Sequence, residues 1–504
     1  MIKNFKWLLF ASLSIGLVAC SDDDTEGEVA EVPISAGTAD FSKYVALGDS
    51  FAAGFSDNAL FKKGQENGYP NILAQQLALA GGGAFTVPYM NDNVGGFSAG
   101  GNQIPQFPTR LYFNGVGPVN VTGVSSTSIA DQLSGPFNNM GVPGAKSFHL
   151  TVNGYGAANP YFGRFDSSAG ASVIGDATAQ NATFFSLWIG GNDVLSYASS
   201  GGIGVNQTGN LNPATYGSND ITDPMVFDNV YNGLVNAMTA NGAKGVVANL
   251  PYINTLPYFT TVPYNPVPLD EATATQLNTQ LLGPVKQILT AFNQGDRIAT
   301  LTAGATNPLL IKDESLTNYG PQITGALIGA GVPAAQAGLM GNLYGQARHA
   351  KKNGTFVDYI VLPTRSIIGT SQAGIPAPFN TVGVTYPLQD GAVLTDAEAT
   401  EVETATDAYN ITIKNVAETK GLAFVDTKAI MQQLLNGGIR FGNYHLTATY
   451  VTGGTFSLDG IHPSSRGYAY LANQFLKAIG MTYGSSIPEV NIGNYNVQYG
   501  QTIN

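Results

Sequence analysis

The sequence contains little charge and almost no cysteine. Only one of its 504 residues is a cysteine, which excludes an intrachain disulfide. Charged residues make up 11% of the chain, against about 25% in typical soluble proteins. Acidic residues outnumber basic ones by 34 to 22, and the resulting net charge of −12 would repel the phosphates of a nucleic acid. We therefore expect a globular protein that binds no nucleic acid.

The apolar run at the N-terminus is too short to span a bilayer. It covers Trp7–Val18, fewer than the roughly 20 residues that a transmembrane helix needs, and it follows two lysines, as in signal peptides. The run ends in Leu17-Val18-Ala19-Cys20, which resembles a bacterial lipobox. This resemblance implies that residues 1–19 are a lipoprotein signal peptide and that Cys20 is lipidated.

A lipid on Cys20 would make the membrane a partner of the protein. We expect it to be lipid-anchored in the bacterial cell envelope, at the outer membrane. The stretch Ser21-Asp22-Asp23-Asp24 resembles the acidic tag of some surface-exposed Gram-negative lipoproteins, although an acidic stretch is also simply a solvated linker. The leaflet and the outward-facing display therefore stay open. Residues 20–40 are acidic and show no periodicity, which predicts a flexible acidic tether.

Short apolar runs predict strands that are buried on both faces, as in a parallel sheet. These runs are Tyr44–Leu47, Phe184–Ile189, Val246–Leu250 and Leu422–Val425. Helical patterns lie between them, so the sequence predicts an α/β fold with a three-layer doubly wound parallel sheet over residues 41–480. Residues 481–504 then form a C-terminal tail. In such a fold the chemistry lies at the carboxyl ends of the strands.

Three helices are predicted by periodicity and capping. Apolar residues recur at helical spacing over Phe227–Met238, ahead of Gly242. The tetrapeptide Thr395-Asp396-Ala397-Glu398 is a capping box that opens a long helix ending at Gly421, and a last helix covers about 464–479.

Two stretches are longer than ordinary connections, at about 52–138 and 252–390. Long excursions of this kind commonly form lids or binding walls, so we expect insertions in the sheet domain. The second stretch has helical signals over Leu277–Phe292 and Ala334–Ala350 and is alternatively a separate small domain. Its first residues, Leu250–Tyr264, are rich in Tyr, Phe and Pro, and these side chains either wall a pocket or pack a long loop.

A serine and a histidine stand in positions that suit acyl transfer. The first predicted strand is followed by Gly48-Asp49-Ser50-Phe51, and Asp459-Gly460-Ile461-His462 precedes the last helix. A serine hydroxyl is a weak nucleophile, so it needs a base within hydrogen-bond reach and a third group that orients that base. An aspartate and a histidine three residues apart on one turn can supply both.

These residues resemble the motifs of the GDSL, or SGNH, family of serine hydrolases. Four blocks occur in the order of that family, with Phe51 at the place of the name-giving leucine: Gly48–Phe51, Gly141–Gly144, Gly190–Asp193 and Asp459–His462. The resemblance covers about half of the chain and implies the SGNH-hydrolase fold.

The resemblance also implies roles for individual residues. Ser50 would be the nucleophile, His462 the base and Asp459 the partner that orients the base. Gly144 and Asn192 would complete an oxyanion hole with the Ser50 backbone N–H. Such fixed neutral donors lower the energy of a tetrahedral intermediate, and glycine and asparagine can supply them at close range.

Other candidate sites in the sequence are weaker. Gly96-Phe97-Ser98-Ala99-Gly100 matches the nucleophile elbow of the α/β-hydrolases, but it lacks the flanking strand and helix, so Ser98 is expected in a glycine-rich loop. His149, His349 and His445 are expected to be structural, with His349 on a solvated helix. No cluster has metal-ligand spacing and no nucleotide-binding glycine pattern follows a strand, so we expect chemistry without metal or cofactor.

The sequence therefore predicts an ester hydrolase, an esterase, lipase or acylhydrolase that acts on a lipid or small acyl ester through an acyl-enzyme. Two alternatives stay open. A carbohydrate O-acetyl esterase would use the same residues with a more polar cleft. A surface-binding lipoprotein would keep the fold without the chemistry, which the intact motif residues argue against.

Overall fold

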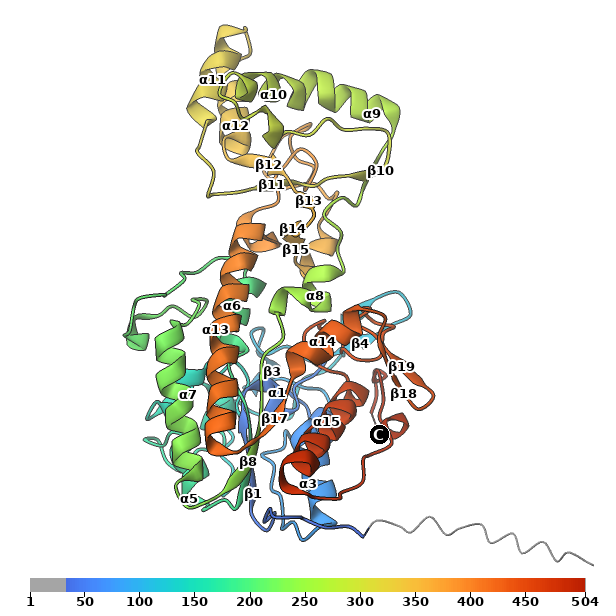
Figure 1. The fold of residues 1–504 in the computed structure, drawn as a ribbon. Helices are drawn as coiled ribbons and strands as arrows, with labels where there is room; N and C mark the ends of the chain where they lie inside the picture. The colour runs from blue at the N-terminus through green and yellow to red at the C-terminus, as the bar shows by residue number, and fades with distance from the viewer. Residues whose placement is uncertain (1–32, 504) are drawn as a thin grey trace, which may run out of the picture. The chain divides into compact units, whose positions relative to one another are not determined.

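The computed structural model describes residues 33–503 of the chain (Figure 1). The predicted signal peptide, the predicted lipidation site Cys20 and most of the predicted tether lie outside the described residues. Two residues at the end of that tether, Thr38 and Ala39, belong to the packed structure. The Thr38 N–H donates to the carbonyl of Tyr483 at 2.8 Å, and Ala39 is buried. Ordered structure therefore begins before Phe41.

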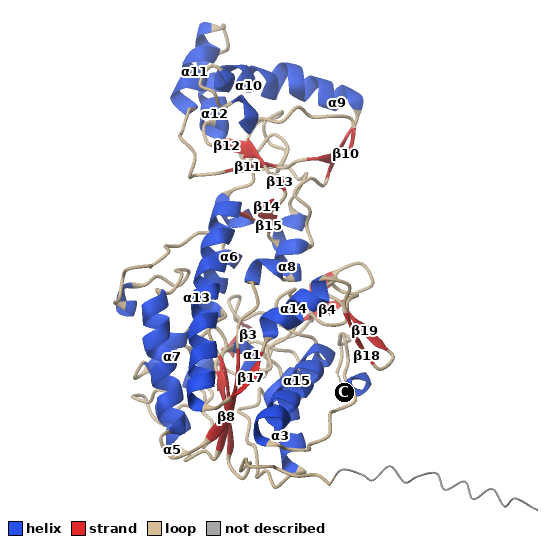
Figure 2. Ribbon diagram, in the orientation of Figure 1, coloured by secondary structure: helices blue, strands red, loops and turns tan. Residues whose placement is uncertain are grey.

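A five-stranded parallel sheet forms the centre of the fold, drawn in red in Figure 2. Its strands, in spatial order, are β17 (Ala423–Val425), β8 (Lys244–Ala248), β7 (Phe184–Trp188), β1 (Tyr44–Gly48) and β6 (Asn139–Gly141). Numbered along the chain, this order is 2-1-3-4-5, the flavodoxin-like doubly wound arrangement. Strand β1 lies between β6, the next strand of the sheet along the chain, and β7, the strand after that. The strand order therefore reverses at β1, and a crevice is expected at its carboxyl end.

Helices cover both faces of the sheet and make a three-layer α/β structure, as predicted (Figure 1). On one face α15 packs on α3, β8 and β17; on the other, α13 packs on α7, β8 and β17. These helices are α3 (Tyr69–Ala78), α15 (Ser465–Tyr483), α13 (Asp396–Lys420), α7 (Pro224–Thr239) and, beside α7, α5 (Val173–Ala179).

Local sequence explains the main elements. Every residue of β1 and of β7 is buried, as the continuous apolar runs predict. Helix α13 begins at the predicted capping box, where the Thr395 N–H donates to Glu398 Oε2 at 2.7 Å, and it ends at Gly421, whose φ is +62°. The last helix α15 is longer than predicted and ends at Tyr483.

The first predicted insertion, 52–138, contains part of the central three-layer fold, because α3 belongs to one of the helical layers on the sheet. The rest of the segment carries short elements. These are α2 (Lys62–Glu66), β2 (Ser98–Ala99), β3 (Asn102–Gln103), β4 (Leu111–Phe113) and β5 (Pro118–Asn120). In the two hairpins, β2 pairs with β3 and β4 with β5.

The second predicted insertion has apolar clusters of its own, although the chain from Ile34 onward forms one compact unit. Its helices and strands are β9 (Val267–Leu269), α9 (Glu271–Gln276), α10 (Leu282–Thr290), β10 (Gly304–Asn307), β11 (Leu310–Lys312), α11 (Gly320–Gly329), α12 (Ala334–Tyr344), β12 (Ala347–His349), β13 (Lys352–Asn353), β14 (Phe356–Val357) and β15 (Tyr359–Ile360), which pairs with β16 (Val393–Leu394). A π-helical turn, Leu277–Leu281, joins α9 to α10.

The sequence prediction was wrong for the last residues of the second helix predicted in this segment. The helix predicted over Ala334–Ala350 stops at Tyr344, and His349 lies in β12 rather than on a solvated helix. His349 is 3% exposed, and its Nδ1 accepts the Ala299 N–H at 3.0 Å. Antiparallel pairing of β12 with β11 outweighs the local helical pattern here.

The remaining elements are short, and the segment predicted as a tail is packed. They are α1 (Ser50–Ala53), α4 (Pro160–Gly163), α6 (Asn192–Ser199), α8 (Pro257–Thr260), α14 (Thr427–Leu435), β18 (Ile439–Phe441) and β19 (Tyr444–Leu446). In the C-terminal segment Ile492 is fully buried. The buried guanidinium of Arg110 donates to the carbonyls of Gly500 and Gln501 at 2.7 and 3.0 Å. None of the helices within residues 33–503 is long and apolar enough to cross a membrane.

Candidate active site

The fold brings Ser50, His462 and Asp459 together at the carboxyl end of β1. Ser50 is the first residue of α1, directly after the strand, and the loop that carries the other two residues precedes α15. Ser50 Oγ lies 2.8 Å from His462 Nε2, and His462 Nδ1 lies 2.9 Å from Asp459 Oδ2. With the Nδ1 proton donated to the carboxylate, Nε2 can accept the proton of the serine hydroxyl.

The Asp459 carboxylate is held by three backbone amides in addition to the imidazole. Its Oδ1 accepts the N–H groups of Ile461 and His462, each at 2.8 Å, and its Oδ2 accepts the Asn58 N–H at 3.0 Å. Burial acts to raise the pKa of Asp459, but the positive charge of His462 and these hydrogen bonds outweigh it, so the pKa lies below its usual value. The carboxylate therefore stays ionised and fixed in orientation.

Aromatic rings flank the imidazole. The ring centres of Phe51 and Phe55 lie 5.1 and 4.7 Å from that of His462, and both phenylalanines are half-buried. His462 itself is 8% exposed. Walls of this kind keep water away from the two hydrogen bonds of the ring, which strengthens both.

Gly144 and Asn192 follow the two strands that neighbour β1. Gly144 comes after β6 and has a φ of +78°, a conformation that glycine adopts without strain. Asn192 opens α6 after β7, and its Nδ2 donates one hydrogen bond, to the Ala145 carbonyl at 3.0 Å. Among the described residues the N–H groups of Ser50 and Gly144 have no hydrogen-bond partner. A second carboxamide N–H and two backbone N–H groups thus remain available to an incoming oxygen.

A buried carboxylate fixes the loop that carries Gly144. Asp193 accepts the Ser147 N–H at 2.8 Å and the Ser147 hydroxyl at 2.7 Å, and it is completely buried. Burial raises the pKa of Asp193, while the two bonds from Ser147 and the charge of Lys146 act to lower it. Asp193 stands in the motif that pointed to Asn192, but nothing in the sequence pairs it with Ser147.

A second support of the site is the turn Ser56–Ala59, whose partners the sequence does not reveal. Asp57 and Asn58 at its centre both have positive φ, +51° and +63°, and the two ends pair with each other, as in a tight hairpin turn. Asp57 Oδ1 accepts the Leu458 N–H at 2.9 Å. An Asp-Asn pair is a turn signal, but its partners lie 401 positions away.

The second insertion also contacts the loop 459–462. Gly460 has a φ of +75°, and a methyl group at its Cα would lie 3.0 Å from the Tyr258 nitrogen and 3.2 Å from a Leu362 methyl carbon. The Tyr258 N–H donates to the Gly460 carbonyl at 2.9 Å. The aromatic residues of this segment divide between both expected roles, because Phe259 is buried in the core whereas Tyr258 lines a cavity.

The other residues singled out in the sequence lie elsewhere. Ser98 is in β2 and donates to the Thr127 carbonyl at 3.2 Å. His149 accepts the Lys146 N–H, and burial, with the charge of Lys146, lowers its pKa to about 4. His445 lies in β19 with its Nε2 2.8 Å from the Gly437 carbonyl.

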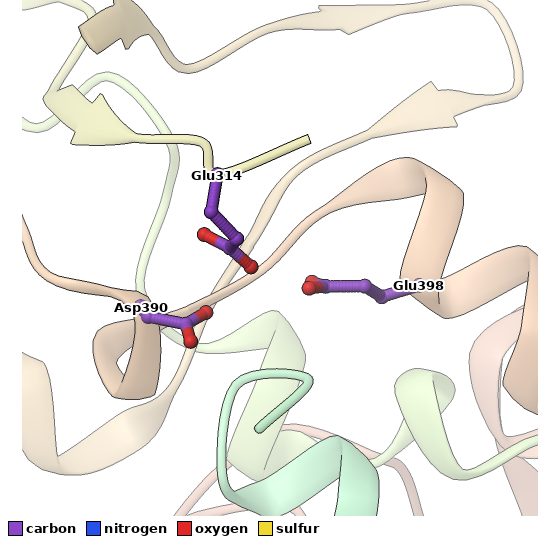
Figure 3. A group of neighbouring side chains, drawn as sticks. All are labelled: Glu314, Asp390 and Glu398. Carbon is purple, nitrogen blue, oxygen red and sulfur yellow. The ribbon is translucent and has the colours of Figure 1, made fainter. Parts of the chain in front are cut away.

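Three carboxylates that the sequence does not group meet in the structure. Figure 3 shows Glu314, Asp390 and Glu398 pointing toward one another, with an oxygen of each within 4.8 Å of the others. Burial, joined by the neighbouring negative charges, raises the pKa of Asp390 to about 6 and that of Glu398 to about 7. Glu398 is also bonded by the backbone and side chain of Thr395 in its capping box.

Comparison with known proteins yields only distant likenesses. No protein-family model and no curated protein matches the sequence. A mutant of an acetyl-xylooligosaccharide esterase from Geobacillus is 12% identical, with a TM-score of 0.32 over 88% of this chain and 96% of its own. An α/β hydrolase from the metagenome of Lake Arreo is 12% identical, with a TM-score of 0.31 over 88% and 96%. An extracellular lipase from Streptomyces rimosus is 12% identical, with a TM-score of 0.28 over 87% and 98%. Scores this low assign neither family nor function.

Proposed function

We propose that this chain is a serine ester hydrolase of the GDSL, or SGNH, type. The observation that supports it most is the continuous hydrogen-bonded row from Ser50 Oγ through the His462 ring to Asp459, at 2.8 and 2.9 Å. A hydroxyl, a base and a base-orienting carboxylate in one row are what acyl transfer requires.

In the proposed reaction Ser50 Oγ attacks the ester carbonyl carbon while its proton passes to His462 Nε2. The tetrahedral intermediate collapses, the carbon–oxygen bond to the alcohol breaks, and the alcohol leaves with the proton from Nε2. Water then attacks the acyl-enzyme, giving its proton to His462, and the carboxylic acid is released as Ser50 recovers its proton. Asp459 stabilises the imidazolium in both halves and keeps its Nδ1 protonated.

The developing negative oxygen would be held by the N–H groups of Ser50 and Gly144 and by Asn192. Support comes from their free N–H groups and from the bond to Ala145 that orients the carboxamide. Each such donor contributes about 10²- to 10³-fold in rate when it is fixed in advance.

The test is hydrolysis of p-nitrophenyl acetate by wild type, Ser50→Ala and Ser98→Ala. Ser98 is the matched control, a buried serine that lies in β2 and bonds Thr127. We expect Ser50→Ala to lose about 10⁴-fold or more in kcat, and Ser98→Ala to stay near wild type. Activity that survives in Ser50→Ala contradicts the assignment, and a wild type without any esterase activity would favour the silent surface-binding alternative.

A second series of substrates identifies the acyl group that the enzyme prefers. The wild type is compared on p-nitrophenyl esters of increasing chain length and on acetylated xylan. A preference for long chains indicates a lipase or acylhydrolase, whereas release of acetate alone indicates a carbohydrate O-acetyl esterase.

We also propose that the mature chain is anchored through lipid on Cys20 in the bacterial cell envelope. The support is the lipobox-like end of the N-terminal apolar run. A Cys20→Ser variant should lose the membrane-bound fraction of the activity in the native host. Equal membrane binding of the variant would contradict the anchor.

A further inference from the structure

A cavity of about 490 Å³ lies beside the proposed catalytic row, where three distant segments meet. One wall is the β4–β5 hairpin with Val116, the second is the part of the second insertion that carries Tyr258 and Arg365, and the third is the loop with Asp459. Its volume falls in the range of about 300–1,000 Å³ that is usual for small-molecule sites. It is therefore large enough for a ligand of the size of a sugar ring or larger.

The position of the cavity fits the alcohol side of an ester. The departing alcohol takes its proton from His462 Nε2, so it must lie on the imidazole side of the carbonyl carbon, away from Gly144 and Asn192. Asp459 and Asn58, which line the cavity, are the next groups beyond the imidazole in that direction. An alcohol in this cavity would therefore have to extend past the imidazole as far as Asp459.

Apolar side chains form much of the cavity wall, and the hydroxyl groups of its two tyrosines already have hydrogen-bond partners. The hydroxyl of Tyr258 lies 3.4 Å from the Ser199 carbonyl, and that of Tyr450 donates to Leu458 at 2.6 Å. The two tyrosines therefore offer mainly ring surface to a ligand, next to leucine, valine and proline side chains. Asn58, Gly117 and Ser366 also line the cavity.

Two residues of the lining carry a charge, Arg365 and Asp459. Within residues 33–503, Arg365 forms no ion pair and its side chain makes no hydrogen bond, whereas the Asp459 carboxylate is committed to His462 and three backbone amides. Burial, followed by the negative charge of Asp459, raises the pKa of Tyr450 to about 12, and the charge of Arg365 acts in the opposite direction. An unpaired arginine suits a carboxylate or a phosphate, which it can bind with two parallel N–H groups.

We infer that this cavity binds the alcohol part of the ester and that Arg365 selects alcohols that carry an anionic group. The inference rests on the proposed function and narrows its substrate class to esters of a carboxylate- or phosphate-bearing alcohol. Arg365 then determines specificity, since it touches the substrate but takes no part in bond making.

The first test compares three acetate esters with similar leaving groups: para-acetoxybenzoate, para-acetoxyphenyl phosphate and the uncharged para-acetoxybenzamide. We expect the wild type to show a KM for an anionic ester about three- to fivefold below that for the amide at low salt, the size of one exposed ion pair, and the preference should fade at high salt. A preference for the carboxylate alone, the phosphate alone or both identifies the anion and supports the inference.

Arg365→Gln should remove this preference by raising the KM for the anionic ester to that for the amide. Arg440→Gln is the matched control, an exposed arginine on β18 outside the cavity, and it should keep the preference. If the wild type hydrolyses the three esters with equal KM, or if Arg365→Gln retains the preference, the inference is wrong while the proposed function stands. A wild type that cleaves none of them contradicts the proposed function and the inference together.

A second variant tests the cavity independently of charge. Val116 is 93% exposed on the hairpin, so Val116→Trp should fold normally while narrowing the cavity. We expect roughly tenfold slower cleavage of naphthyl acetate relative to ethyl acetate. Met481→Trp, at an equally exposed position on α15, should leave the ratio unchanged. An unchanged ratio in Val116→Trp places the alcohol elsewhere and overturns the inference.

Discussion

Replacement of Asp459 by asparagine tests whether the carboxylate sets the protonation of the imidazole. The side chain keeps its shape, but one oxygen becomes an NH₂ group. Oδ1 accepts two backbone N–H groups, from Ile461 and His462, so the amide oxygen must occupy that position. The NH₂ group then replaces Oδ2 and faces the Nδ1–H of His462 and the N–H of Asn58, both of which are donors.

The expected loss follows from those two contacts. Each contact is a hydrogen bond to a charged group and contributes about 1.5–3 kcal/mol of stabilisation. The loss of both therefore removes about 3–6 kcal/mol of the stabilisation that the carboxylate gives to the protonated ring. The ring can restore one contact by moving its proton to Nε2, but Nε2 then cannot accept the Ser50 proton. Both routes raise the barrier, and we expect kcat to fall about 10²- to 10⁴-fold.

The assay is steady-state hydrolysis of p-nitrophenyl acetate, with thermal unfolding as a check that the variant is folded. KM should change little, because the carboxylate does not touch the substrate carbonyl. Asp296→Asn, at an exposed aspartate in the second insertion, is the control for loss of one negative charge. A kcat within tenfold of wild type in folded Asp459→Asn would refute the role of this carboxylate.

Three further outcomes are expected. Asn192→Ala should lower kcat about 10²- to 10³-fold with little change in KM, because it removes one donor to the oxyanion, and a parallel rise in KM would contradict this. Asp57→Ala should lower the free energy of unfolding in urea by about 1–3 kcal/mol, because the Leu458 N–H loses its acceptor, whereas Asp57→Asn should restore most of it. The pKa of Glu398 is raised from 4.5 to about 7, chiefly by burial, so the stability that its proton provides is complete below pH 4.5 and is lost as the pH rises through 7. Glu398→Gln keeps the capping box and should remove about 1 kcal/mol of this pH dependence, after allowance for solvent screening. Thermal melts below pH 4.5 and above pH 7 measure the difference.

The central sheet could be predicted where strands are buried on both faces. The runs that become β1 and β7 are apolar throughout, and a continuous apolar run has few other stable places in a protein. Strand β6 could not be predicted, because Asn139-Met140-Gly141 is short and carries no strand signal. It exists because Ala46 and its neighbours in β1 offer it hydrogen-bonding partners.

The proposed catalytic residues could be predicted from the sequence, but the residues that hold them in place could not. Ser50 and His462 stand in short motifs whose residue types are dictated by chemistry. Asp57 and Asn58, by contrast, act through backbone N–H groups and a buried carboxylate, and such contacts leave no local pattern. His349 shows the same limit, since only pairing with β11 decides that it lies in a strand.

Arg110 imposes an order on the maturation of the chain. Its buried guanidinium donates to carbonyls 390 and 391 positions further along. At about 5–20 residues per second, ribosomes need roughly 20–80 s to synthesise that length. Throughout this interval the arginine lacks these two acceptors and can donate only to the carbonyls of Asn93 and Leu111, at 2.8 and 3.3 Å. A chain truncated before residue 500 would therefore bury a guanidinium whose Nη2 group lacks both of its carbonyl acceptors.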